Sequence, residues 1–493
     1  MSRARCAAMP QSPASPPGRL AIVLRCVGKW GGVRLEIGLI AAAGLFALNG
    51  WNPAWGQKPA PQATAQDYGL VISRQGAVRQ GDGRRVLVQN AAGSEVVALL
   101  HVDVGDRRLV ILPNGRLSSF PISETKATQQ PFVPATRDQL AAELGQTFAD
   151  FHTRTNPQSR YVYVYNASDD FWKATSRILE SMYNPVLAYF RSHKFAVHDP
   201  ATPLVVVMFR TEDEFQKYQK MPPGVVAYYN PVSNYVVMYE QSKLVEVAPD
   251  LAVRQSIATI AHEGIHQILH NIGIQQRLAR WPLWTAEGVA EYFAPTSCDK
   301  RLRWKGVGVI NDLRMYELEQ YFTSGQGQPG ELLSTTIASQ KMGSLGYASS
   351  WALTHYLARM HKDKFFAYLA EVSKLEPFAE DGLGLRRGPD NKELFVKYFG
   401  SDYATLENEL IKYLKKQPYT NPLENQTHYV VMLSMPSQRT AGVTSSPTAV
   451  TEWEQQTLAT VPANLRAAAT FMVRPFSNRA EAEQFAKQWL HSR

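Results

Sequence analysis

The sequence predicts an α+β fold in which strands and helices first alternate and a run of helices then follows. The segments RYVYVYN at 160–166 and TPLVVVMF at 202–209 have the composition of strands, whereas 169–192 and 211–220 have the apolar spacing of helices. After residue 250 the helical spacing continues through further segments. Mixed strands and helices followed by helices are typical of an α+β domain.

Two strands of the predicted sheet form a hairpin shortly before the helical region. GVVAYY at 224–229 and NYVVMYE at 234–240 flank the turn NPVS. We expect the strand at 234–240 to lie at the edge of the sheet, where its free backbone groups could pair with an extended peptide. A sheet edge that binds no ligand is the alternative.

The helix that follows carries a pattern of zinc-binding residues. In IATIAHEGIHQILHN, residues 257–271, apolar residues recur on one face, and Gly273 is expected to end the helix. His262 and His266 are one turn apart, so both imidazoles can reach one ion. Glu263 is displaced around the axis by about 100° and would act as general base on water at the ion. The alternative is a structural helix whose histidines bond to carbonyl groups.

A third ligand is predicted on the next helix, WPLWTAEGVAEYF at 281–293. Glu287 and Glu291 are one turn apart, and the short connection at 272–280 would return this helix to the first. Glu287 would complete the ligand set, and Glu291 would accept a hydrogen bond from the outer nitrogen of a ligand histidine. His270 is expected to be only a neighbour of the site, because a fourth protein ligand would close the catalytic position.

These two segments together resemble the gluzincin metallopeptidases. HEGIH followed by EGVAEYF carries the likeness, and a narrower likeness to the family of unknown function named DUF1570 extends over roughly Arg160 to Lys415. Further matches to that family are the segments at 223–240 and 347–357. The resemblance implies a gluzincin-like metallopeptidase domain whose zinc ligands and general base would be, in this order, His262, His266, Glu287 and Glu263.

The same resemblance indicates a residue that would stabilise the transition state. Some gluzincins have a tyrosine where Tyr347 begins the predicted helix YASSWALTHYLARM, and a phenol there could donate to the developing oxyanion. The sequence departs from the aminopeptidase form, which has Lys-Gly where Ser349 and Ser350 stand. A tyrosine that only packs at the start of a helix is an equal alternative, and His355 and Tyr356 are further candidates.

Other parts of the chain have less distinctive patterns. The stretch 296–346 contains several glycine-rich turns and is predicted to be a long irregular segment. Helices are predicted to resume at 348–373, 391–399 and 402–416. On the N-terminal side of the sheet, residues 137–155 are predicted to form a helix.

Length and composition predict several domains. The 493 residues, 45% of them hydrophobic, allow two to four domains. We expect a small β-rich domain at 57–120, a linker at 121–137, the metallopeptidase-like domain at 138–420 and a small βαβ-type domain at 425–493. The last segment faintly resembles the SPOR domain, which binds peptidoglycan glycan strands, through PFSNRAEAE; a generic βαβ unit is the alternative.

The N-terminal segment has the pattern of an export signal. Basic residues precede the apolar run IGLIAAAGLFAL, and Ala54 and Gly56 stand at expected cleavage positions. We therefore expect residues 1–56 to be a signal peptide or, if uncleaved, an N-terminal membrane anchor, and the protein to be exported. An exported protein of this kind would be periplasmic, in the cell envelope or extracellular.

Charge and cysteine content agree with export, but they exclude few other classes of protein. The net charge is +9, but residues 1–56 contain six basic residues and one acidic residue, so the remainder carries +4. This mild excess does not favour nucleic acid as a partner. Of the three cysteines only Cys298 lies outside the signal segment, and we expect it to be a small apolar residue rather than a regulatory thiol.

The sequence therefore predicts an exported zinc-dependent metallohydrolase that acts on peptides or proteins. Two alternatives stay open. One is an envelope protein that binds peptidoglycan on a zinc peptidase scaffold with little or no turnover. The other is an amidase that uses the same site on peptidoglycan peptides.

Overall fold

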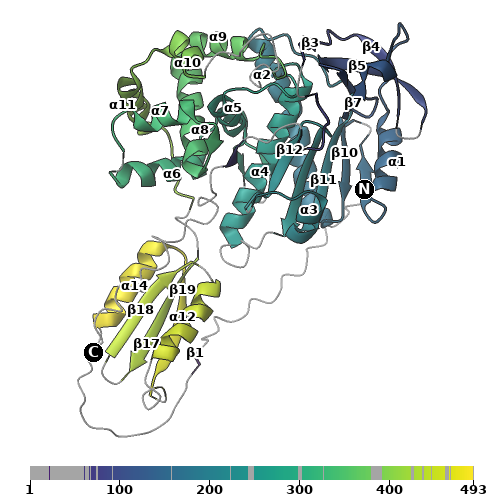
Figure 1. The fold of residues 1–493 in the computed structure, drawn as a ribbon. Coiled ribbons are helices and arrows are strands. Elements are labelled where there is room, and N and C mark those ends of the chain that lie inside the picture. The colour runs from purple at the N-terminus through teal and green to yellow at the C-terminus, as the bar shows by residue number, and fades with distance from the viewer. Residues whose placement is uncertain are drawn as a thin grey trace, which may run out of the picture. The chain divides into compact units, whose positions relative to one another are not determined.

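The computed structural model divides into two compact units (Figure 1), and each is described by itself. The larger comprises Pro53–Val245 with Pro249–Asn421, and the smaller comprises Met1–Asn52, Glu246–Ala248 and Pro422–Arg493. The structure describes, besides the short strands at 21–22 and 60–61, residues 66, 68–73, 76–90, 93–156, 158–222, 224–241, 249–297, 303–325, 327–378, 391–422, 427–435, 438–445, 447–460, 466 and 468–491. The rest of the predicted signal segment and Cys298 lie outside these residues.

The larger unit is built around a five-stranded mixed sheet, which confirms the predicted α+β fold. The strand order is β12-β13-β11-β10-β9; the three central strands are parallel and each edge strand is antiparallel to its neighbour. The strands are β9 (His152–Thr155), β10 (Tyr161–Tyr165), β11 (Leu204–Thr211), β12 (Ala227–Asn230) and β13 (Tyr235–Gln241). The predicted strands at 160–166 and 202–209 and the hairpin are all present.

Helices cover both faces of this sheet, because its central strands are apolar on both sides. Alternate residues of β10 and β11 face α2 (Asp169–Ser192) and α4 (Pro249–Asn271) in one core cluster. The intervening residues pack against α1 (Arg137–Thr147) and α3 (Glu212–Tyr218) in another. Thr211 caps α3, since its side chain accepts from the backbone of Glu214.

Two predictions about this sheet are wrong. The strand predicted at the edge, 234–240, is β13, which lies between β11 and β12; the edge strand is β12. Strand β13 is internal because it pairs on both sides, in parallel with β11 and through the hairpin with β12. The helix predicted at 137–155 ends at Thr147, and β9 takes the last residues, since His152–Thr155 pair with β10.

A small antiparallel β region precedes the sheet, as the sequence predicts, and it belongs to the same compact unit as the sheet. Its strands are β3 (Val78–Gln80), β4 (Arg85–Gln89), β5 (Glu95–Val104), β6 (Arg107–Ile111), β7 (Leu117–Pro121) and β8 (Lys126–Ala127). A register shift between Leu100 and Val102 turns the second half of β5 toward the other face. The second half of β5 packs against Val232 and Phe378 of the larger unit.

The remainder of the larger unit is mostly helical, and helices resume after α5 earlier than predicted. The stretch 296–346 is not irregular: Asn311 caps α6, and α7 follows. The predicted helix at 348–373 is two helices that part at His361. The helices are α5 (Leu283–Phe293), α6 (Asp312–Thr323), α7 (Glu331–Ala338), α8 (Ser344–Met360), α9 (Lys362–Val372), α10 (Asn391–Phe399) and α11 (Tyr403–Leu414). This region also contains two short strand pairs. Strand β14 (Thr296–Ser297) pairs with β15 (Arg303–Trp304), and β16 (Lys341–Met342) pairs with β2 (Ala60–Pro61).

The smaller unit contains an antiparallel sheet of order β1-β19-β17-β18 with helices on it. Its elements are β1 (Ala21–Ile22), β17 (His428–Met435), β18 (Gln438–Thr444), α12 (Pro447–Thr460), β19 (Thr470–Phe476) and α14 (Arg479–His491). Strands β18 and β19 are both antiparallel to β17 and therefore parallel to each other. Together with α12 they form a split βαβ unit, with β17 between the two parallel strands.

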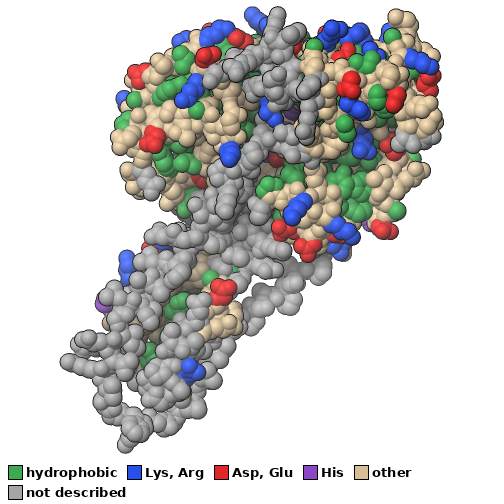
Figure 2. All heavy atoms as spheres, in the orientation of Figure 1, with side chains coloured by type: hydrophobic (Ala, Val, Ile, Leu, Met, Phe, Trp, Pro, Cys, Tyr) green, Lys and Arg blue, Asp and Glu red, His purple; other side chains and the backbone are tan. Residues whose placement is uncertain are grey.

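The surface carries charges of both signs. Figure 2 shows basic and acidic side chains interspersed over the visible face of the larger unit. Within the described ranges, every helix is too short or too polar to traverse a lipid bilayer.

Candidate metal centre

Helices α4 and α5 hold the predicted ligands because their apolar faces are fixed in the core. Ile260, Ala261, Ile265 and Leu269 of α4 are at most 2% exposed. This leaves the neighbouring face of the helix, with His262 and His266, turned toward α5. Gly273 ends α4 with a positive φ of 88°, as its position predicts.

The three predicted ligands come together in one group. Nε2 of His262 lies 3.2 Å from Nε2 of His266 and 3.0 Å from Oε2 of Glu287. Nε2 of His266 lies 3.5 Å from the same oxygen. Among the described residues, the group of side chains that could hold a metal ion consists of His262, His266 and Glu287.

These separations fit a tetrahedral ion. Zinc bonds of about 2.0–2.1 Å at tetrahedral angles place neighbouring donor atoms roughly 3.3 Å apart. The three observed separations, 3.0, 3.2 and 3.5 Å, bracket that value. Two imidazoles and one carboxylate are also the donor set of a catalytic zinc site that leaves one position open.

The charges around the group also fit a cation. The carboxyl groups of Glu263, Glu287, Glu291 and Glu317 gather there, and the Arg314 guanidinium is paired with two of them. Burial by itself would raise the pKa of Glu287, but His266 and His262 hold it well below its usual range. Buried carboxylates are tolerated only when cations neutralise them, so a divalent cation would stabilise this cluster.

Glu263 lies beside the group and contacts the sheet edge. Its Oε2 accepts a 2.7 Å hydrogen bond from the backbone N–H of Tyr229 in β12. Burial raises the pKa of Glu263, while His262 and His266 act in the opposite direction. A carboxyl group with a raised pKa next to a potential metal site is suited to take up and release a proton.

Glu291 orients His262 from behind. Oε1 of Glu291 lies 3.2 Å from Nδ1 of His262, and its other oxygen accepts from Nδ2 of Asn311 at 2.9 Å. Burial alone would raise the pKa of Glu291, but Arg314 and His262 lower it to about 2. Glu291 is therefore an anion at ion-pair distance from Nδ1 of His262, while Nε2 of the same ring faces His266 and Glu287.

Tyr347 lies next to the group in the first turn of α8. Its ring is 6.0 Å from the ring of His262 and nearly perpendicular to it. Burial raises the pKa of Tyr347 well above its usual range, and Glu287 and Glu263 add to this effect. The phenol is thus held as a proton donor.

The other candidates are engaged elsewhere. His270 stacks on Tyr229 with ring centroids 5.1 Å apart, and burial lowers its pKa well below the usual value. His355 bonds to the carbonyl of Gly308 and to the hydroxyl of Tyr413. The hydroxyl of Tyr356 donates to Glu409. These side chains have structural partners away from the three ligands.

Two glycines allow the site helices to approach their neighbours closely. A Cβ at Gly288 would lie 2.4 Å from Oγ1 of Thr354 and 2.5 Å from the carbonyl oxygen of Ser350, so α5 and α8 touch there. A Cβ at Gly264 would lie 2.3 Å from Leu179 of α2. The glycine of EGVAE thus has a packing role that brings α8, and with it Tyr347, to the ligands.

The structure adds three residues that the sequence interpretation did not identify. Arg314 and Asn311 bind Glu291, and Glu317 binds Arg314. All lie at the start of α6, in the stretch predicted to be irregular. Asn311 followed by apolar residues at helical spacing was an available signal for the helix, but nothing local indicates that Arg314 faces Glu291.

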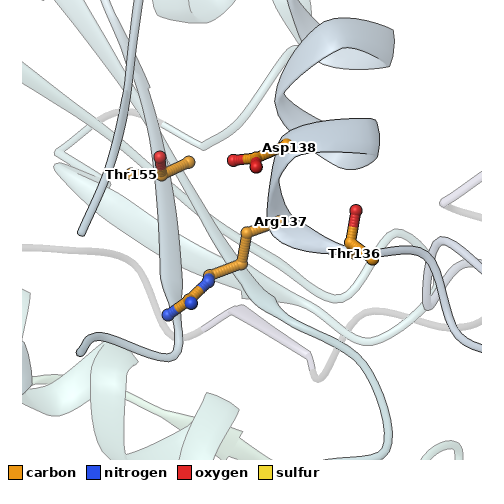
Figure 3. A pocket seen from close by; sticks show the side chains of 4 residues that line it. All are labelled: Thr136, Arg137, Asp138 and Thr155. Carbon is orange, nitrogen blue, oxygen red and sulfur yellow. The ribbon is translucent and has the colours of Figure 1, made fainter. Parts of the chain in front are cut away.

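Two surface pockets lie apart from His262, His266 and Glu287. The pocket in Figure 3 is lined by Thr136, Arg137 and Asp138 at the start of α1 and by Thr155 of β9. Strand β9 is the opposite edge of the sheet from β12. Arg137 donates to the carbonyl oxygens of Asn156 and Ser159, so it is already satisfied.

Comparison with known proteins gives a partial match to one family model and no activity. Residues 256–379 match a family model described as "Protein of unknown function (DUF1570)". This is narrower than the resemblance over Arg160 to Lys415 that the sequence suggested, and the hairpin lies outside it. No curated protein matches the chain. Over about a quarter of its length, which contains the three ligands, Arg314 and Tyr347, the protein is similar to this family of unknown function.

Proposed function

We propose that this protein is an exported zinc-dependent hydrolase of gluzincin type whose substrates are peptides or proteins. The observation that carries the proposal is the convergence of His262, His266 and Glu287 with donor separations near 3.3 Å, with Glu263 beside them. The HExxH helix and the glutamate of the following helix are the arrangement of such hydrolases.

Each residue has a defined part in this proposal. Zinc, when bound, would polarise the scissile carbonyl group and make water more acidic. Glu263 takes the proton from that water and transfers it to the leaving amine. The phenol of Tyr347 donates to the oxyanion of the tetrahedral intermediate. Glu291 keeps His262 in the orientation that ligation requires.

The sheet edge supports a peptide as the substrate. Strand β12 is the edge strand, and the Tyr229 N–H that bonds to Glu263 belongs to it. An extended peptide that runs beside β12 would therefore pass close to the proposed base. We therefore propose that a peptide substrate pairs with β12, instead of with the strand at 234–240.

The proposal is tested by incubating the purified protein with an unfolded protein chain and, separately, with peptidoglycan peptides. We expect cleavage of the protein chain that a zinc chelator abolishes and added zinc restores. Cleavage of peptidoglycan peptides alone would favour an amidase. Zinc binding without cleavage of either would favour an envelope-binding protein. Export is tested by sequencing the N-terminus of the protein isolated from its native cells, which should begin near Gln57.

A further inference from the structure

Arg314 occupies a central place between the ligands and helix α8. It lies in the first turn of α6, and its side chain is mostly enclosed. Nη2 donates to Oε1 of Glu291 at 2.7 Å, and Nη1 donates to the two oxygens of Glu317 at 3.0 and 3.1 Å. The planar guanidinium therefore bridges two buried carboxylates.

One arm of this bridge ends at a metal ligand. Oε1 of Glu291, the oxygen that accepts from Arg314, is also the oxygen 3.2 Å from Nδ1 of His262. A guanidinium on this oxygen fixes the position of the carboxylate, which lies at ion-pair distance from the His262 ring. Groups that bind ligand histidines in this way set metal affinity, with losses of about 10–100-fold when they are removed.

The other arm ends at the helix that carries Tyr347. Glu317 accepts a hydrogen bond from the hydroxyl of Ser344, the first residue of α8. The guanidinium carbon of Arg314 also lies 5.2 Å from the ring centroid of Tyr347, over its face. Arg314 thus contacts the ring of Tyr347 directly. It also reaches the start of α8 through Glu317 and the predicted ligand His262 through Glu291.

We propose that Arg314 is a positioning residue that couples the metal ligands to Tyr347. It aligns His262 through Glu291, and it holds the ring of Tyr347 beside His262 through its own face contact and through Glu317. Its effect on metal affinity follows from the contacts alone, whereas its effect on turnover rests on the proposed function.

Lysine cannot replace arginine in this role. An ammonium group is a compact charge without a planar fork, so it can neutralise the carboxylates but cannot bond to Glu291 and Glu317 while stacking on Tyr347. If Arg314 served only to neutralise charge, Arg314→Lys would behave like the wild type.

The experiment measures zinc affinity by competition with a chromophoric chelator, on the full chain. We expect Arg314→Met to bind zinc about 10–100-fold more weakly and Arg314→Lys to fall between it and the wild type. Because Arg314 acts through Glu291, adding Arg314→Met to Glu291→Gln should weaken binding little beyond the Glu291→Gln variant. Arg359→Met is the matched control: it removes a guanidinium that bonds to the carbonyl of Gly308, and zinc affinity should not change.

A compensated variant excludes simple unfolding. Arg314→Met leaves two buried carboxylates without their cation, so Glu317→Leu is combined with it to remove one of them. This double variant should melt closer to the wild type than Arg314→Met yet keep the weaker zinc affinity. Affinity within about threefold of the wild type in the folded double variant would overturn the proposal, as would a wild type that binds no zinc.

Turnover provides a second readout. If hydrolysis is found, Arg314→Met should lower kcat more than it raises KM, and its effect should not add to that of Tyr347→Phe. Fully additive effects would contradict the coupling. Zinc binding that depends on Arg314 in a protein that hydrolyses nothing would remove the proposed function and leave the positioning role of Arg314 in place.

Discussion

The backbone N–H of Tyr229 donates a 2.7 Å hydrogen bond to Oε2 of Glu263, so the edge of the sheet and the proposed base are in direct contact. The donor is a main-chain group, and it therefore stays in place when side chains are changed. It holds one carboxylate oxygen toward β12 and orients the carboxyl group beside His262 and His266. A shift of the β12 backbone should thus affect the base, and any peptide paired there would lie next to it.

Glu263→Gln tests the role of this carboxyl group. Glutamine keeps an oxygen for the Tyr229 N–H but cannot accept a proton, so we expect hydrolysis to fall by about 10²–10⁴-fold with zinc still bound. Peptide cleavage and metal content would be measured on the same sample. Glu409→Gln is the control, because Glu409 bonds to Tyr356 away from the ligands. Retained activity in Glu263→Gln would exclude Glu263 as the base.

Tyr347→Phe separates a catalytic phenol from a packing ring. The ring contacts with His262 and Arg314 survive in phenylalanine, whereas the proton donor is lost. We expect kcat to fall by about 10²–10³-fold, as for loss of one oxyanion donor, with KM and zinc content almost unchanged. Tyr356→Phe is the matched control and should leave kcat unaltered. An unaltered kcat in Tyr347→Phe would mean that the tyrosine only packs.

Much of the site region could be predicted because its signals are local. Two helices and three candidate ligands follow from local patterns alone: the spacing of His262 and His266, the apolar stripe of α4 and the EGVAE segment. The strands β10, β11 and β13 are continuous apolar runs, and Thr211 with Glu214 forms a capping box. Each of these patterns spans a few residues in sequence.

The remaining features depend on contacts between distant segments. Strand β13 was expected at the sheet edge, but it pairs in parallel with β11 as well as with its hairpin partner β12. His152–Thr155 have helical neighbours, yet they pair with β10. Arg314 reaches Glu291 only because α6 packs on α8, and no local pattern specifies that contact. Tertiary pairing overrides local preference at each of these places.

Gly288→Ala should loosen the contact between α5 and α8. The added Cβ would lie 2.4 Å from Oγ1 of Thr354 and 2.5 Å from the carbonyl of Ser350, so we expect a loss of about 1–3 kcal/mol in the free energy of unfolding. The control is Gly145→Ala in α1, where the Cβ meets only Thr153 at 3.9 Å. That change should stabilise the protein by about 0.5–1 kcal/mol. Denaturant unfolding measures both, and effects of equal sign would contradict the packing argument.

Stability should fall in mild acid, partly through His355. Burial lowers the pKa of His355 from 6.5 to about 4, against a raising effect of the Gly308 carbonyl. Between these values the unfolded chain binds more protons than the folded one, so the free energy of unfolding decreases as the pH falls from about 6.5 toward 4.

The His355→Gln variant isolates this contribution. Glutamine keeps a donor for Gly308 but does not titrate, so the loss of stability between pH 7 and pH 5 should be smaller by roughly 2 kcal/mol. Some pH dependence should persist, because burial also lowers the pKa of His101 to about 4. Parallel stability curves for the variant and the wild type would show that His355 does not titrate as described.

The metal content of the purified protein tests the central claim most directly. It would be measured by elemental analysis beside a Glu287→Ala variant, after incubation of both with zinc and removal of the excess. The three-ligand centre predicts about one zinc per chain in the wild type and a strong reduction in Glu287→Ala. A wild type that holds no zinc, or a Glu287→Ala variant that holds as much as the wild type, would contradict it.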